Sequence, residues 1–232
     1  MTLRFYSQFA KQYLQELLSG FGNVEVSPEQ IEHEQEQAIV LFFPNSGFVL
    51  SNSELGLLAR IAQSDCALNV YCDLIDEDEV LNCIRKLFSV LALLQSQAKQ
   101  NNLPLEEDKL PSSRILVPSA SIDLLDGFGG RLKEDWPCGI YFLPPIYRTA
   151  IVAIDSLPIT PDTLWLRLLG KGEIQRQAIC ELLALPENNV FRQNILDLIS
   201  HWYNAIIQSL DNLTPDEQEL IANLSLIFDG KA

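Results

Sequence analysis

The chain is 232 residues long, and 47% of its residues are hydrophobic while 20% are charged. This composition supports a buried core and excludes an intrinsically disordered chain, which combines low hydrophobicity with high charge. Asp and Glu (31) outnumber Lys and Arg (16), so the formal net charge is −15. That sign is the opposite of what a non-specific nucleic-acid binder needs in order to attract phosphates.

The first half of the chain alternates between helices and strands, as judged from the spacing of its apolar residues. Helices are predicted at residues 2–18, 54–63 and 76–99, and strands at 23–27, 38–43 and 67–71. The run 38–43 is apolar throughout, which is typical of a strand buried on both faces. Asp76 is a suitable N-cap for the long helix, and the acidic residues that follow it favour the positive end of the helix dipole.

The second half changes character near residues 156–160. Strands are predicted at 114–118, 139–143 and 150–154, followed by helices at 160–169, 173–185, 188–209 and from 214 onward. The Gly-rich stretches 127–130 and 170–172 lack the spacing of nucleotide-binding loops and predict turns. We therefore expect an α/β protein with a mixed sheet flanked by helices in residues 1–156, and an all-helical region in residues 157–232.

The cysteine and histidine residues indicate a reducing environment rather than a metal or cofactor site. The cysteines form no Cys-x-x-Cys pair and lie far from the histidines, which predicts reduced thiols and neither a metal centre nor a cofactor. The sequence does not open with a basic segment followed by an apolar run, and no stretch reaches 18 uninterrupted apolar residues. We therefore expect a cytoplasmic protein that does not enter a membrane. The residues concerned are Cys66, Cys72, Cys83, Cys138, Cys180, His33 and His201.

Several stretches are distinctive in the order of their residues rather than in their composition. The most specific is 157–172, which contains Trp165, and the others are 8–18, 127–132, 136–137, 139–144, 175–179 and 181–186. Together they resemble a large cyanobacterial protein family that is similar to the PD-(D/E)XK restriction-endonuclease-like superfamily. That family is also similar to the recombination-promoting nucleases and putative transposases. The resemblance covers nearly the whole chain, and it implies a restriction-endonuclease-like mixed sheet.

The resemblance also implies a metal site, and the sequence departs from it. Active members of the superfamily hold Mg²⁺ with an Asp on the second core strand and an acid-x-Lys pair on the third. The relatives carry a Gln-x-Asp-x-x-Phe strand, and Ile39 stands at the Asp position here. The next strand offers Asn69 and Tyr71 in place of the acid and the Lys. Because residues 38–50 contain no Asp or Glu, a shifted register does not restore the ligand, and we expect a degenerate site.

Other acidic residues near these strands are candidate ligands. Glu107 and Lys109 form the one nearby acid-x-Lys match, within a polar loop. Glu34 and Glu36 directly precede the apolar strand. Solvated charge runs are the favoured explanation of both pairs, since clustered charges usually lie on exposed faces. If these residues are catalytic, Mg²⁺ is the cofactor they would hold.

Positive charge balances negative charge only near the start of the helical region. Trp165, Arg167, Lys171 and Arg176 form a candidate contact surface of basic and aromatic side chains. The alternative is helix packing, in which the arginine stems cover apolar surface and keep their charged ends in water.

Three functional interpretations follow. The missing strand acid and the charge of −15 favour a non-catalytic nuclease-like protein that acts as a binding, regulatory or accessory protein through protein–protein contacts. Its partner would carry a basic surface, since opposite charges steer association, and nucleic acid is not expected as a partner. The resemblance alone implies the alternative, a Mg²⁺-dependent DNA endonuclease. A third interpretation is a structural subunit that docks through the apolar helix 219–228, although packing of that helix within the chain explains its apolar residues equally well. The oligomeric state stays open.

Overall fold

The computed structural model describes residues 2–26, 37–45, 54–102, 104, 106–107, 110–209 and 215–229. Its helices are α1 (Thr2–Leu18), α2 (Leu57–Ile61), α3 (Glu77–Gln100), α4 (Ile122–Gly127), α5 (Leu164–Arg167), α6 (Gly172–Ala184), α7 (Arg192–Ser209) and α8 (Pro215–Asp229). Its strands are β1 (Gly22–Val26), β2 (Gln37–Pro44), β3 (Cys66–Tyr71), β4 (Ser112–Val117), β5 (Ile140–Phe142) and β6 (Thr149–Ala153). Short 3₁₀ turns lie at Pro145–Tyr147, Ile154–Ser156 and Pro161–Thr163.

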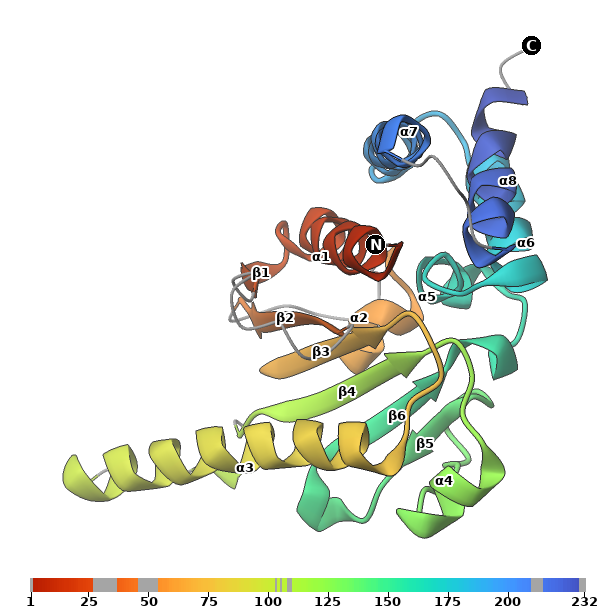
Figure 1. Cartoon of the computed structure of the whole chain (residues 1–232). Coiled ribbons are helices and arrows are strands. Elements are labelled where there is room, and N and C mark those ends of the chain that lie inside the picture. Colours follow the sequence, from red (N-terminus) through yellow and green to blue (C-terminus); the bar gives the residue numbers. More distant parts are fainter. Residues whose placement is uncertain are drawn as a thin grey trace.

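The described strands form a six-stranded mixed sheet in the order β1-β2-β3-β4-β6-β5 (Figure 1). β1, β2 and β3 are antiparallel neighbours, whereas β4 runs parallel to β3 and β6 runs parallel to β4. β5 lies at the edge, antiparallel to β6. Parallel neighbours need a crossover connection, and α3 lies in the one between β3 and β4. The predicted α/β class, with a mixed sheet and a helical C-terminal region, is confirmed.

Helices cover the sheet on both faces. Figure 1 shows α1 and α3 on opposite sides of the sheet. Side chains alternate along each strand, so Val40 and Leu68 join the large core on the α1 side while Ile115 joins a smaller core on the α3 side. The same alternation points Gln37 and Asn69 toward α3, where Gln37 contacts the helix. Two cores of unequal size therefore share one sheet.

Helix α3 buries side chains only along its N-terminal half, as far as the described residues show. Asp76 and Glu79 form the predicted N-terminal cap as a capping box, in which each side chain accepts a hydrogen bond from the other residue's backbone N–H, at 2.9 and 2.8 Å. Four side chains of the first three turns are buried, and none is buried from Phe88 onward. Figure 1 shows this second half extending beyond the sheet. The buried four are Val80, Cys83, Ile84 and Leu87.

The helical C-terminal region packs on α1 and shares its core. The Tyr6 hydroxyl donates to the carbonyl of Leu169, and the Tyr13 hydroxyl donates to that of Trp165 at 2.8 Å. Apolar side chains of α1, the sheet and helices α5 to α8 form one continuous cluster. Secondary structure changes near residue 156, as the sequence suggests, but the hydrophobic core runs across that point. Among the described helices, none has the length and apolar character needed to span a membrane.

Some elements differ from their sequence-based predictions. Strand β2 is fully buried on the α1 face only, since on the α3 face Gln37 is buried but Ile39 is half-buried and Leu41 is exposed. The helix predicted at 160–169 is a 3₁₀ turn followed by the single turn of α5, because Thr163 directs its hydroxyl to the carbonyls of Pro158 and Thr160. Helix α4, capped by Ser121, was not predicted, because its six residues are too few to show a clear period.

We predict that a chain ending at Ser156 does not fold into a compact unit. It would lack the carbonyl groups that accept from Tyr6 and Tyr13, and the apolar face of α1 would be exposed to water. The measurement is binding of a hydrophobic dye together with near-ultraviolet circular dichroism, with the full chain as the control. A cooperative unfolding transition in the truncated chain would contradict the shared core.

Candidate functional site

The sheet face beneath α3 holds the positions where the resemblance implies a metal. The register of β2 and β3 places Ile39 opposite Asn69 and Gln37 opposite Tyr71. Paired residues in an antiparallel ladder lie on the same face, so the three positions singled out in the sequence are neighbours here. Asn69 and Tyr71 are buried, and Ile39 is half-buried.

The polar side chains at this face satisfy one another. Gln37 Nε2 donates to Asn69 Oδ1 at 2.9 Å and lies 3.3 Å from Cys83 Sγ on α3. Asn69 Nδ2 donates to Ser113 Oγ on β4 at 3.0 Å, and Tyr71 Oη lies 3.3 Å from Cys83 Sγ. We call these five residues the amide network. All five are buried, so the network links β2, β3, β4 and α3 without contact with bulk water.

The amide network is electrically neutral inside. Burial raises the pKa of the Cys83 thiol. Burial also raises the pKa of Tyr71 far above its usual range, and the neighbouring Cys83 acts in the same direction. The nearest positive charge, Lys86, is exposed and donates to Gln37 Oε1 at 3.2 Å. Both titratable groups therefore stay protonated at neutral pH.

Neutral amides, a thiol and a phenol are poor ligands for a hard divalent cation. Mg²⁺ is usually held in proteins by one or two carboxylates and keeps several waters, which needs charged oxygens and open space. The side-chain oxygens of Asn69 and Gln37 already accept hydrogen bonds, from Gln37 and from Lys86 respectively. Across the part of the chain that the structure describes, no group of three or more His, Cys, Asp or Glu residues could hold a metal ion.

The other acidic candidates do not converge on this face. Glu34, Glu36 and Lys109 lie outside the described residues. Glu107 is exposed, and its backbone carbonyl accepts from Arg148 Nη2 at 3.1 Å. The structure thus brings Ile39, Asn69 and Tyr71 together and leaves Glu107 in a surface segment.

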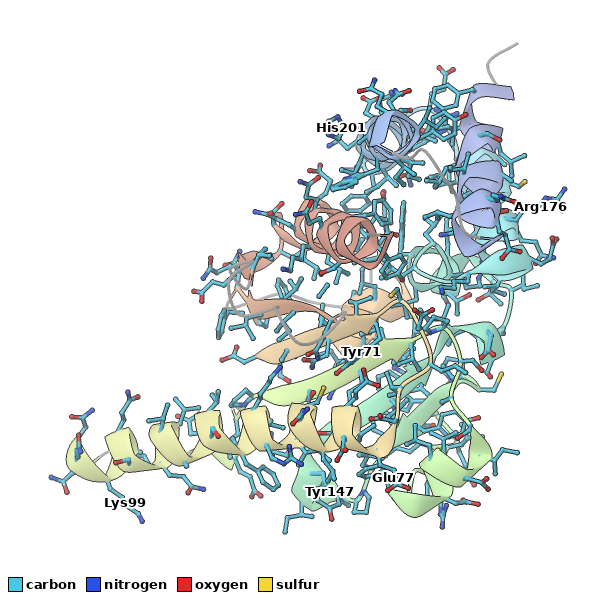
Figure 2. All side chains as sticks on the ribbon, viewed as in Figure 1. Tyr71, Glu77, Lys99, Tyr147, Arg176 and His201 are labelled. Atoms are coloured by element: carbon cyan, nitrogen blue, oxygen red, sulfur yellow. The ribbon has the colours of Figure 1, made fainter. Side chains whose placement is uncertain are left out.

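The candidate contact surface of basic and aromatic side chains is not one surface. Trp165 and Arg167 are buried, and Arg167 donates to both carboxylate oxygens of Glu181, at 2.9 and 2.5 Å. Lys171 instead pairs with Asp73. Arg176 stands out from α6 in Figure 2 and pairs with exposed Glu173 at 3.1 Å. The prediction of one contact surface that includes all four residues is wrong, because Trp165 and Arg167 are buried in the core.

Sequence reasoning missed a cavity of about 570 Å³ that shares no lining residue with the amide network. It lies where β4 and β6 begin and β5 ends, and its lining includes Arg114, Arg131, Lys133 and Arg148. These residues come from two strand ends and a loop, so no spacing in the sequence marks them as a group.

Comparisons with known proteins add no relative. No protein-family model, no curated protein and no solved structure matches this chain. Its function is therefore inferred from its own residues, and the relationship to PD-(D/E)XK nucleases stays a prediction.

We predict that the amide network stabilises the fold as a coupled unit. Asn69→Leu leaves Gln37 Nε2 and Ser113 Oγ short of partners, which costs about 1–3 kcal/mol of unfolding free energy. Combining it with Gln37→Leu is expected to cost clearly less than the sum of the two single changes, with a coupling of about 1 kcal/mol or more. Urea titration measures each value. Gln97→Leu on the exposed part of α3 is the control, and additive effects would show that no network exists.

Proposed function

We propose that this chain is a non-catalytic protein with a nuclease-like core, which acts as a binding, regulatory or accessory protein through protein–protein contacts. The observation that carries the proposal is the amide network, which fills the face where the resemblance implies a metal. The element order α1, β1, β2, α2, β3, α3, β4 is compatible with a nuclease-like core, although many α/β domains share it. A scaffold with that order and neutral side chains at the metal positions can bind but has no evident means of activating water.

The free half of α3 supports the protein-binding part of the proposal. Val90 and Leu93 are exposed by 47% and 63%, in a stretch where no side chain is buried. A short isolated helix is marginally stable in water, so a stretch with no buried side chain gains from a partner that covers its apolar side chains. Figure 2 places Lys99 near the end of this extension.

The charge of the chain selects the partner. At −15, the molecule attracts a cationic partner and repels an anionic one at long range. We therefore infer a protein with a basic surface that places apolar side chains against Val90 and Leu93.

Catalysis is tested first. We predict that the full chain shows no thermal shift with millimolar Mg²⁺ or Mn²⁺ and does not cleave plasmid or linear DNA. The physical reason is that Asn69 and Tyr71 offer neutral side chains, and that no group of three or more His, Cys, Asp or Glu among the described residues could hold a metal ion. A thermal shift that Glu107→Gln or Glu36→Gln removes, but Glu173→Gln on α6 leaves intact, would favour the endonuclease. DNA cleavage abolished by EDTA would overturn the proposal.

The binding surface is tested separately. A partner isolated with the full chain and then purified should bind the Val90→Ser/Leu93→Ser variant at least about tenfold more weakly, because two apolar anchors are lost. It should also carry net positive charge and bind more weakly at high salt. The control is Ile122→Ser on α4, an exposed apolar residue distant in the chain from the extension. Equal binding by both variants contradicts this surface, and a dimer lost in the first variant would make a second copy the occupant.

A further inference from the structure

The cavity on the α2 side of the sheet concentrates positive charge in an acidic protein. Its described lining contains four cationic side chains and neither Asp nor Glu. The whole chain has 16 Lys and Arg against 31 Asp and Glu, so a quarter of its cations face one cavity. A low-dielectric concavity lined by one sign of charge concentrates the field and attracts counter-ions. The four are Arg114, Arg131, Lys133 and Arg148.

Two of these arginines are fixed by backbone carbonyls and keep donors free. Arg114 Nε donates to the Ile61 carbonyl at 3.0 Å, and its Nη1 donates to the Ser113 carbonyl at 3.0 Å. Arg148 uses Nε and Nη2 to reach the carbonyls of Pro111 and Leu110, at 3.1 and 2.8 Å. Within the described structure, Arg114 Nη2 and Arg148 Nη1 donate to nothing. Held guanidinium groups with free N–H donors are organised in advance to receive an oxyanion.

The positive charge of the cavity is not neutralised by the chain. No described carboxylate pairs with Arg114, Arg148 or Lys133, and Lys133 lies over the Phe142 ring at 4.0 Å. Arg131 pairs with Asp126 at 3.2 Å, but both side chains are exposed and such pairs are weak. Burial lowers the pKa of Arg114, the nearby Cys66 opposes this, and the like charge of Arg148 lowers it further. A bound anion would relieve this repulsion.

The remaining wall of the cavity is apolar and the volume exceeds that of a phosphate ion. Phe142, Leu143, Pro144 and Pro145 line it beside the cations. About 570 Å³ falls in the range of pockets that enclose small organic ligands. An inorganic anion would leave most of this space unfilled.

We propose that this cavity binds a small organic anion of nucleotide size that carries two or more phosphate groups. The phosphates face Arg114 and Arg148, with Arg131 and Lys133 closing over them from the loop, and the organic part lies against Phe142 and the prolines. A long nucleic acid is disfavoured, because the overall charge of −15 acts on every phosphate that lies outside the cavity. This site is independent of the proposed protein-binding function and shares no lining residue with the amide network.

The test uses the full chain and isothermal titration calorimetry at physiological salt without divalent cations. The probes are ATP, inorganic tripolyphosphate and uncharged adenosine. We expect ATP to bind more tightly than tripolyphosphate, and adenosine not to bind. Arg131→Gln/Lys133→Gln changes two exposed residues and is expected to raise the Kd for ATP at least about tenfold. Arg114→Lys keeps the charge but loses the forked donors, and should also raise the Kd.

The matched control is Arg85→Gln/Arg176→Gln, which removes the same charge from exposed positions on α3 and α6. Its Kd for ATP should equal that of the unchanged chain. Equal weakening in both double variants would overturn the proposal, since it would reflect net charge alone. So would no ATP binding at millimolar concentration, equal binding of adenosine, or tighter binding of a single-stranded oligonucleotide than of ATP. Tripolyphosphate binding as tightly as ATP would overturn the organic part of the ligand.

Discussion

The strongest constraint on this molecule is that polar side chains buried between the sheet and α3 must satisfy one another. A buried amide without a partner costs free energy, and a buried unpaired charge costs far more. Gln37 and Asn69 meet this requirement by bonding to each other, to Ser113 on β4 and to α3. The result links three strands and a helix, and it places neutral side chains at the positions where the resemblance implies charged metal ligands.

Two arginines outside the amide network differ in whether their positive charge is neutralised by a carboxylate. Arg167 is fully buried, and its guanidinium donates hydrogen bonds to the Glu181 carboxylate and to the Thr163 hydroxyl. The two nitrogens that face Glu181 form a forked pair of bonds with its two oxygens. Arg114 is half-buried and is held by backbone carbonyls, with no described carboxylate opposite it. A matched arginine is structural, because its charge is already neutralised. An arginine held in place but not neutralised keeps its field directed at the cavity, and that difference separates the core from the proposed ligand site.

The sequence predicts more of the fold than of the sites. Apolar periodicity places α1 and α3, and Asp76 marks the start of α3, because helix ends and long amphipathic stretches are local features. Ile39, Asn69 and Tyr71 could be singled out because each lies within a strand whose pattern is readable. Arg167 was assigned to a surface because its partner Glu181 is 14 residues away and its burial depends on tertiary packing. The cavity cations at 114, 131, 133 and 148 meet only when β4, β5 and β6 are assembled.

The amide network and the cavity meet at one residue of β4. Ser113 accepts from Asn69 through its hydroxyl on the α3 face, while its backbone carbonyl accepts from Arg114 and its N–H donates to the carbonyl of Arg148 at 3.0 Å. The two sites therefore share a strand end but no side-chain donor. Changes to residues in direct contact rarely have additive effects, so a substitution at Ser113 would disturb both sites and distinguish neither. Asn69 and Lys133 lie on opposite sides of that strand end without a shared hydrogen-bond partner, which is why the stability of the network and the affinity of the cavity can be measured independently.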